Sequence, residues 1–265
     1  MPTALGTRSP KLDAVRDLRT SRGRREQARF AFEGSTLLAE AVAGRVALGE
    51  VYATEAGYAS IDAALRGGIA CPVYFISERA MARISDLETP PGLLATAPVR
   101  LAEASTLLAG GGPVLLLAGI ADPGNAGTLL RSAEIFGLGA VLFGEDGVEP
   151  YNPKVVRGSM GAIFRLRIGS IAAASVAALA ASAGYTVVAT DRSGGPLPAF
   201  AFPERLLLAV GNERRGVGGW LPGWDAAVAI PQPGAGESLN AAVAGSIVLY
   251  ELAHGREARV AHKKP

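Results

Sequence analysis

The sequence predicts an α/β protein made of two parts, and three observations carry that prediction. From about residue 30, short apolar runs with strand character alternate with runs of helical period. The strand candidates of the C-terminal part are continuously apolar, which is typical of a mostly parallel sheet covered on both faces. Residues 110–113 are Gly-Gly-Gly-Pro, which favours a linker between two compact bodies.

The N-terminal part is predicted to be a small α/β unit that covers residues 1–99 and precedes a linker at 100–112. Its strand candidates are rich in Phe, Tyr, Val and Leu, and the segments between them have helical period. In chain order these elements are FAFEG (30–34), STLLAEAVAG (35–44), EVYATE (50–55), SIDAALRGG (60–68), CPVYFIS (71–77), ERAMARISDL (78–87) and GLLATAPV (92–99).

The C-terminal part, residues 113–265, is predicted to be a second and larger α/β series. Its strands are long apolar runs, and the Ala-rich segment before residue 184 is interpreted as a packed helix. The expected order is VLLLAGI (114–120), a helix at 127–136, AVLFG (140–144), a helix at 152–164, RLRI (165–168), a helix at 171–183, YTVVATD (185–191), RLLLAVG (205–211), AAVAIP (226–231) and a last helix at about 237–253.

One segment, ADPGNAGTLLRSAEIFGLGA (121–140), combines a turn with an unusual helix. Pro123, Gly124, Asn125 and Gly127 disfavour regular structure, so we expect a turn before the helix. Arg131 then stands among apolar residues, where a guanidinium costs desolvation energy unless it meets an anion or reaches water. This arginine is therefore a candidate functional residue.

Composition and charge exclude several classes of protein. No apolar run approaches the roughly 18 residues of a membrane span, and the N-terminus has no apolar signal core. The single cysteine, Cys71, excludes an internal disulfide and a cysteine-built metal site. We therefore expect a soluble, cytoplasmic protein that makes no membrane contact.

The net charge of +2 is unevenly distributed along the chain. Residues 1–32 hold eight Lys/Arg and three Asp/Glu, which gives +5 and leaves −3 for the rest of the sequence. A basic arm on a near-neutral body is a possible footprint for a phosphate backbone. A solvated helix face would have the same composition, so both interpretations stay open.

The residue inventory argues against several chemistries. Only His254 and His262 are present, so a Ser-His-Asp triad would need a histidine from the C-terminal tail. Zinc ligands are too few, and no G-x-x-x-x-G-K-[ST] loop is present. GAGESL (234–239) lacks the third glycine of a dinucleotide-binding fingerprint and is a weak signal.

Three loops that leave predicted strands carry a stronger signal: ADPGNAGTLLR, VGNERRGV and IPQPGAGESLN. Open α/β sheets bind ligands at the carboxyl ends of their strands. In this order and spacing the loops resemble the three signature motifs of the SpoU family of RNA ribose 2′-O-methyltransferases, in the SPOUT superfamily. The resemblance extends through NPKVVRGSMGAIFRLRI. It also includes SRGRREQARFAFEGSTLLAEAV and FISERAMARISDLETPPGLLATA, which resemble a small RNA-binding domain.

The resemblance implies features that strand and helix patterns alone do not predict. It implies that residues 113–265 form a SPOUT methyltransferase domain with a C-terminal trefoil knot, although knots are rare exceptions among folds. It also implies S-adenosylmethionine as methyl donor, RNA as substrate, and a homodimer whose formation completes the RNA site.

The resemblance places the donor on Gly211, Ile230 and Leu239. Gly211 has no Cβ and lets a ligand approach the backbone closely, and Ile230 precedes a proline that keeps the chain extended. Each residue has an ordinary structural alternative: a strand-ending turn for Gly211, and core packing for Ile230 and Leu239.

The catalytic positions implied by the resemblance are Asn125 and Arg131, Glu213, and Ser238 and Asn240. Arg131 would face the RNA phosphate and the ribose hydroxyl. A guanidinium with a pKa above about 12 is a poor base, so we interpret Arg131 as an electrostatic clamp, with phosphate or water accepting the proton. Each residue also has an ordinary structural interpretation. Asn125 is typical of a turn, and Glu213 could be an exposed, solvated carboxylate. Ser238 and Asn240 are typical of a helix N-cap.

Three further points concern RNA. Arg22, Arg24 and Arg25 in the basic arm are candidate phosphate contacts, and Arg214 and Arg215 either contact RNA or are simply exposed. The N-terminal domain resembles those of ribosomal RNA enzymes, which favours 23S rRNA as substrate. A tRNA ribose 2′-O-methyltransferase and a non-catalytic RNA-binding module are the alternatives.

Overall fold

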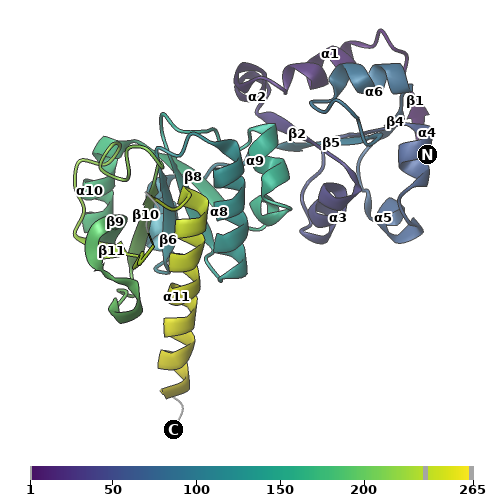
Figure 1. Ribbon diagram of the computed structural model, residues 1–265. Helices are drawn as coiled ribbons and strands as arrows, with labels where there is room; N and C mark the ends of the chain where they lie inside the picture. Colours follow the sequence, from purple (N-terminus) through teal and green to yellow (C-terminus); the bar gives the residue numbers. More distant parts are fainter. Residues whose placement is uncertain (1, 235–237, 263–265) are drawn as a thin grey trace. The chain divides into compact units, whose positions relative to one another are not determined.

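The computed structural model describes residues 2–234 and 238–262 (Figure 1). Its contacts divide the chain into two compact units, which we call the first and second units. The first contains Met1–Arg100 and Tyr151–Phe164, and the second contains Leu101–Pro150 and Arg165–Pro265. The predicted linker at 100–112 contains a helix, α7 (Ala104–Ala109), whose Leu107 and Leu108 are buried in the second unit.

The first unit is built on a five-stranded mixed sheet in the order β1-β4-β3-β5-β2. The pairs of β5 with β2 and β3 are antiparallel, whereas those of β4 with β1 and β3 are parallel. The strands are β1 (Thr3–Ala4), β2 (Arg29–Glu33), β3 (Val51–Ala53), β4 (Val73–Phe75) and β5 (Leu93–Pro98). The helices are α1 (Pro10–Asp17), α2 (Ser21–Gln27), α3 (Ser35–Ala43), α4 (Glu55–Ala59), α5 (Ala63–Gly68), α6 (Glu78–Ile84), α9 (Pro153–Gly158) and the 3₁₀ turn η1 (Ala162–Phe164).

The predicted basic arm is folded structure. Ser9 caps α1 by accepting a hydrogen bond from Lys11 N, and Pro10 occupies the first turn, where a missing N–H costs nothing. Thr20 caps α2 in the same way through Gly23 N, at 3.0 Å. Leu12 and Val15 of α1 are buried in a cluster with Met81 of α6. The apolar side of α1 therefore ties this segment to the body of the first unit.

The segment 151–164 belongs to the first unit although it lies between strands of the second along the chain. The Tyr151 hydroxyl donates to Arg100 O at 2.8 Å, and its ring lies 4.5 Å from that of Phe30. The Phe164 ring lies 5.0 Å from that of Phe32. Because these contacts are aromatic and partly buried, they attach α9 and η1 firmly to strand β2.

The second unit contains a six-stranded sheet in the order β11-β9-β10-β6-β7-β8, and every strand pair in it is parallel. This confirms the predicted parallel sheet. The strands are β6 (Val114–Ala118), β7 (Ala140–Gly144), β8 (Arg167–Ile171), β9 (Thr186–Pro196), β10 (Leu206–Gly211) and β11 (Ala226–Ala229). The helices are α7, α8 (Pro123–Ile135), α10 (Ala173–Ala183), the 3₁₀ turn η2 (Leu197–Ala199) and α11 (Ala241–His262).

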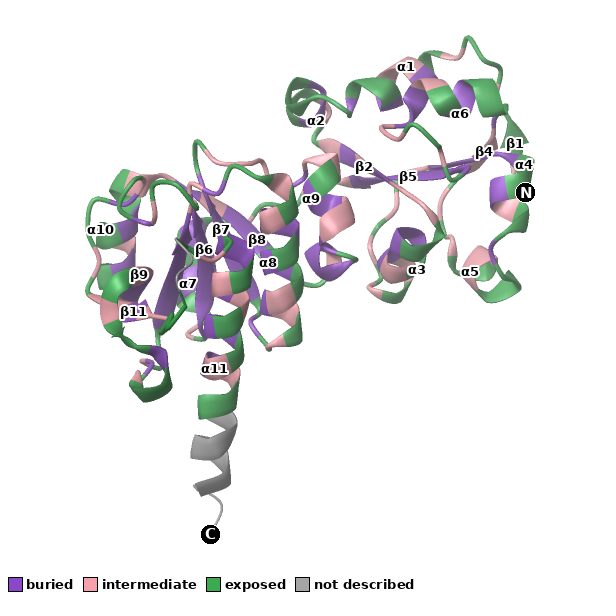
Figure 2. Cartoon of the chain, in the orientation of Figure 1, coloured by how far each residue is buried: buried purple, intermediate pink, exposed green. Residues whose placement is uncertain are grey.

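Helices cover both faces of this sheet, which explains its continuously apolar strands (Figure 2). On one face Leu116 packs in a buried cluster with residues of α7 and α10. Its neighbours Leu115 and Leu117 point to the opposite face, because side chains alternate along a strand, and they are equally buried. Helices α8 and α11 contact each other, and α11 also contacts β9 and β10. None of the helices in the described ranges has the length and apolarity needed to cross a membrane.

Candidate functional site

The candidate site lies at the carboxyl ends of strands β6, β10 and β11, where β9, which continues to Pro196, passes this edge at residues 190–192. Because these strands are parallel, their carboxyl ends meet at one edge of the sheet. Asp122 and Asn125 follow β6, Asn212 and Glu213 follow β10, and Ile230 follows β11. The edge therefore collects all three predicted motif loops, as expected for an open α/β sheet.

The helix of the first motif begins earlier in the sequence than predicted, at Pro123. Asp122 accepts a hydrogen bond from Asn125 N at 2.8 Å and caps α8, and Pro123 takes the first helical position. A proline at this position loses no hydrogen bond and already has a helical φ. The expected turn at residues 123–127 is therefore the first turn of α8, which fixes Asn125 on a rigid element.

Three predicted catalytic side chains form one hydrogen-bonded chain. The Asn125 side-chain amide donates to Glu213 Oε1, and its carbonyl oxygen accepts from Asn240 Nδ2 at 3.0 Å. Asn240 also caps α11, because its Oδ1 accepts from Ala242 N and Val243 N at 2.9 and 3.2 Å. The structure thus joins the three motifs through residues 88 and 115 positions apart in the sequence. Asn240 therefore both caps α11 and belongs to the hydrogen-bonded chain of the candidate site.

The three predicted donor-binding residues line one pocket. Gly211, Ile230 and Leu239 surround an open cavity, which Glu213 and Ser238 also line. Residues 235–237, within the third motif, lie outside the described part of the chain. The grouping agrees with a shared function for the three residues, whose individual roles remain predictions.

The backbone that packs against position 211 requires a glycine there. A Cβ at this position would lie 2.2 Å from Gly216 C and Val217 N, because the second motif turns back over the end of β10. Gly216 N donates to Asn212 O at 2.8 Å, and Arg214 N donates to Asn212 Oδ1 at 2.9 Å. The absence of a side chain at Gly211 therefore allows the turn that presents Glu213. The side chains of Arg214 and Arg215 are exposed.

Arg131 lies on the solvent-exposed stripe of α8, away from the buried Leu129, Leu130 and Ala133. Among the described residues its guanidinium has no hydrogen-bond or ion-pair partner. The guanidinium of Arg131 therefore stays hydrated and incurs no desolvation cost, because its apolar sequence neighbours lie on the buried side of the helix. The cation remains available to an external anion.

Sequence reasoning missed the contribution of β9. Thr190, Asp191 and Arg192 line the same pocket, as does Gln232 after β11. The signal was present in the sequence, because YTVVATD is a predicted parallel strand that ends in a carboxylate. Its carboxyl end had to share the edge used by β6 and β10.

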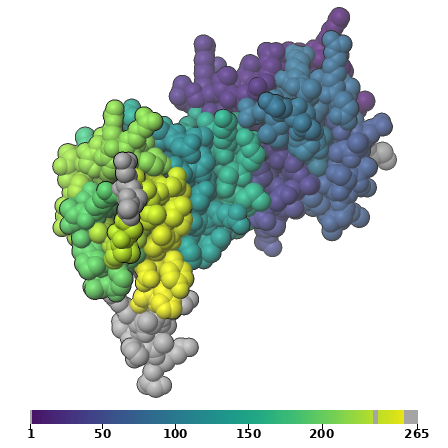
Figure 3. All heavy atoms as spheres, viewed as in Figure 1, coloured from purple at the N-terminus to yellow at the C-terminus, as the bar shows by residue number. Residues whose placement is uncertain are grey.

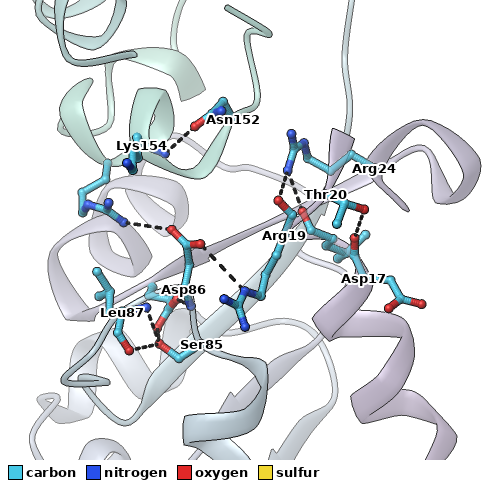
Figure 4. A network of polar contacts seen from close by, with 12 residues as sticks. Asp17, Arg19, Thr20, Arg24, Ser85, Asp86, Leu87, Asn152 and Lys154 are labelled. Atoms are coloured by element: carbon cyan, nitrogen blue, oxygen red, sulfur yellow. Dashed lines mark hydrogen bonds and ion pairs between the residues drawn. The ribbon is translucent and has the colours of Figure 1, made fainter. Parts of the chain in front are cut away.

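The three arginines proposed for RNA contact have different environments. Arg22 and Arg25 are exposed on α2, and Arg22 pairs with Glu26 at 2.7 Å. Arg24 is only 3% exposed, and its Nη1 donates to Leu18 O and Arg19 O at 2.8 and 3.0 Å (Figure 4). Arg24 therefore satisfies the carbonyl of Leu18, the C-cap of α1, and the carbonyl that follows it. Its assignment as a surface RNA contact is corrected accordingly.

Two more basic side chains share one carboxylate in the same unit (Figure 4). Arg19 Nε and Arg157 Nη1 lie 3.8 and 3.9 Å from the two oxygens of Asp86. Glu33 holds the Asp86 backbone by accepting its N–H at 2.8 Å. This arrangement connects α9 to the loop after α6 within the first unit.

Comparison with known proteins places this architecture in a family. The SpoU rRNA Methylase family model matches residues 112–250, just over half of the chain, and the MRM3-like substrate binding domain matches residues 9–95. The chain is 31% identical over 249 residues to the 23S rRNA (guanosine(2553)-2′-O)-methyltransferase RlmP of Bacillus subtilis (strain 168), covering 92% of this chain and 97% of that protein.

Solved structures agree with the family match. An RNA 2′-O ribose methyltransferase superposes with a TM-score of 0.76 at 26% identity, over 97% of this chain and 99% of its own. The fold is also that of the SpoU methyltransferase AviRb from Streptomyces viridochromogenes in complex with AdoMet, with a TM-score of 0.82 at 23% identity, over 94% and 98% of the two chains. With its parallel sheet, its N-terminal substrate-binding domain and its three motif loops at one edge, this chain belongs to the SpoU rRNA methylase family.

Proposed function

We propose that this protein transfers a methyl group from S-adenosylmethionine to the 2′-hydroxyl of a ribose in 23S rRNA. The observation that carries the proposal is the Glu213–Asn125–Asn240 chain beside the pocket of Gly211, Ile230 and Leu239. The near full-length similarity to RlmP supports 23S rRNA as the RNA class. A tRNA substrate remains the alternative that the experiment below distinguishes.

The pocket suits the proposed donor. Val210, Val228, Ile230 and Leu239 give it apolar walls for a purine, and polar groups of Asp191, Gln232 and Ser238 lie at the same cavity. When bound, S-adenosylmethionine supplies an electrophilic methyl group on its sulfonium. Ile230 and Leu239 would pack on the purine, and the chain around Gly211 would offer backbone groups to it.

The chain's own residues would act mainly by positioning. The reaction needs an in-line hydroxyl and loss of its proton, so much of the rate comes from holding the reactants in attack geometry. Asn125 and Asn240 fix Glu213 beside the pocket, and Ser238 lines its wall. Arg131 would hold an RNA phosphate and lower the pKa of the hydroxyl, while phosphate or water accepts the proton. An intact constellation argues against a non-catalytic RNA-binding module.

We also propose a homodimer formed through the α8–α11 apolar face, which we define as Ile135, Val243, Ile247 and Tyr250. These side chains are 64%, 47%, 36% and 51% exposed. Helices α8 and α11 lie side by side, joined by a Ser132–Ser246 hydroxyl contact of 2.7 Å (Figure 3). Exposed large apolar side chains on two adjacent helices favour an interaction surface. Arg131, one turn before Ile135, would then lie at the subunit interface, where dimerisation completes the RNA site.

Replacing Ile247 by Glu should convert the protein to monomers, because the interface would bury an unpaired charge. Sedimentation velocity at micromolar concentration measures this directly. Leu101→Glu is the matched control, since Leu101 is 50% exposed outside the apolar face. A monomeric wild type, or an Ile247→Glu variant that stays dimeric, would contradict the proposed interface.

The contribution of α2 to RNA binding can be tested separately from its contribution to stability. Alanine at both Arg22 and Arg25 should weaken RNA binding and reduce the slope of log affinity against log salt by about 1 to 2, because two phosphate contacts release fewer counterions. Arg24→Ala should instead leave the slope unchanged and lower the free energy of unfolding by about 1–3 kcal/mol, because two carbonyls lose their donor. Filter binding across salt concentrations, with thermal unfolding, distinguishes these effects. An unchanged slope in the double variant would show that α2 is only a solvated face.

The proposed function is tested by mapping ribose methylation in cells with and without the gene. We expect one 23S rRNA 2′-O-methyl group to disappear with the gene and to return with the wild-type gene, but not with an Arg131→Ala copy. Loss of a tRNA methyl group instead would select the tRNA alternative. An unchanged methylation map would overturn the assignment.

We expect an enzyme of this kind to work in the cytoplasm, where ribosomal RNA is available. The C-terminal trefoil knot is also part of the proposal.

A further inference from the structure

The pocket contains a carboxylate to which neither the motif loops nor the proposed chemistry gives a role. Strand β9 lies beside β10 in parallel register, with Ala189 opposite Ala209. The next residues, Thr190 and Asp191, therefore reach the same edge as Gly211, and both line the pocket. Thr190 Oγ1 donates to Ala209 O at 3.2 Å, which ties this part of β9 to β10.

The Asp191 carboxylate is held in one orientation. Its Oδ1 accepts two hydrogen bonds from Ser193, from the backbone N at 2.9 Å and from the hydroxyl at 2.6 Å. Its Oδ2 has no partner among the described residues. The Ser193 hydroxyl, and then the Ser193 backbone N–H, lower the pKa of Asp191, so the group is ionised throughout the neutral range.

Glu213 is the other carboxylate that lines the pocket. Glu213 accepts a hydrogen bond from Asn125 and belongs to the catalytic chain. Among the described residues Asp191 is bonded only to Ser193 of its own strand, so no contact between the motif loops explains its place in the pocket. It also lies on the strand next to the one that leads into the Gly211 turn.

A carboxylate at this place matches the chemistry of a nucleoside. A ribose carries two adjacent hydroxyl donors, one glycosidic bond away from the purine. In dinucleotide-binding α/β folds an acidic side chain beyond a neighbouring parallel strand accepts hydrogen bonds from ribose hydroxyls. The apolar walls that suit the purine, formed by Ile230 and Leu239, surround the same cavity as Asp191.

We propose that Asp191 binds the ribose hydroxyls of the methyl donor, and that Ser193 holds the carboxylate in place for this contact. The inference rests on the proposed function, because it assumes that the pocket takes a nucleoside donor. It adds a donor-binding residue from β9 to the residues of the three motif loops.

The test compares Asp191→Asn with wild type in binding S-adenosylhomocysteine, measured by calorimetry on the full chain without RNA. Asparagine keeps an oxygen for the Ser193 bonds but removes the charge, so the turn should remain. We expect the dissociation constant to rise about 10-fold or more, because a charge-assisted hydrogen bond is lost. Ser193→Ala keeps the carboxylate and should cause a clearly smaller increase. Equal affinity of wild type and Asp191→Asn would overturn the inference.

A second ligand separates the ribose from the charged amino-acid end of the donor. 5′-Methylthioadenosine keeps the purine and the ribose but has no ammonium group, and its affinity is measured by displacement of labelled S-adenosylhomocysteine. If Asp191 binds the ribose, Asp191→Asn should weaken both ligands by the same factor. Weakening of S-adenosylhomocysteine alone would place the carboxylate at the ammonium and overturn the ribose assignment.

The outcome for the wild type separates the two proposals. Failure of the wild-type protein to bind S-adenosylhomocysteine at all would remove the proposed function together with this inference. Binding by the wild type with no effect of Asp191→Asn would remove only the inference. Circular dichroism and the melting temperature of each variant exclude unfolding as the cause of weaker binding.

Discussion

Replacing Arg131 by Ala should reduce the single-turnover rate of methyl transfer by about 10²- to 10³-fold, the cost of removing a preorganised electrostatic donor. The dissociation constant of the methyl donor should stay unchanged, because Arg131 is exposed on α8 while the pocket is built by other loops. Stability should also stay unchanged, because the guanidinium has no partner to lose among the described residues. Rapid-quench assays and calorimetry measure the two effects separately.

Arg131→Lys distinguishes a clamp from a simple charge. Lysine keeps the positive charge but cannot contact a phosphate and a ribose hydroxyl together through a planar fork. A bidentate clamp therefore predicts little recovery over the alanine variant, whereas a pure charge effect predicts substantial recovery. A true arginine base would give a strong pH dependence that the lysine variant shifts to lower pH.

Arg79→Ala is the control for loss of one exposed positive charge, since Arg79 lies on α6 in the first unit and is exposed. Its rate should match the wild type if the charge matters only at position 131. Full activity of Arg131→Ala would contradict both the clamp and the base. Arg131 would then be a helix arginine that only reaches solvent.

Much of the second unit was predictable because its signals are local and repeated. Continuous apolar runs such as VLLLAGI need burial on both faces, and this requirement alone specifies a parallel sheet with helices on each side. Parallel strands then bring their carboxyl ends together, so the loops with Asn125, Glu213 and Asn240 had to meet. The structure adds the hydrogen bonds between them, which no spacing in the sequence specifies.

The structure differs from the sequence-based prediction where a residue's role depends on a partner distant in sequence or on helix capping. Pro123 and Gly124 disfavour helix interiors, but with Asp122 as cap they open α8. Arg24 looks like any other arginine in a basic run, and only the end of α1 beside it makes it a buried capping group. The packing of Tyr151 and Phe164 on β2 likewise depends on aromatic contacts between segments more than 100 residues apart.

Gly211→Ala should weaken donor binding and destabilise the protein even without a donor. The new Cβ would lie 2.2 Å from the backbone of Gly216 and Val217, where no side-chain rotation can relieve the contact. The turn must shift, at a cost of about 1–3 kcal/mol in the free energy of unfolding. Glu213 and the pocket wall shift with it, so calorimetry should show affinity for S-adenosylhomocysteine reduced by at least about 10-fold.

The thermal unfolding of the donor-free protein decides why glycine stands at this position. If the glycine only made room for the donor, the variant would lose affinity but keep its melting temperature. If it makes room for the chain, as the close approach of Gly216 indicates, the melting temperature falls as well. Gly223→Ala is the matched control, because nothing lies within 4 Å of the position its Cβ would take. A Gly211→Ala protein with wild-type stability would show that the turn yields easily, and wild-type affinity would remove Gly211 from the donor site.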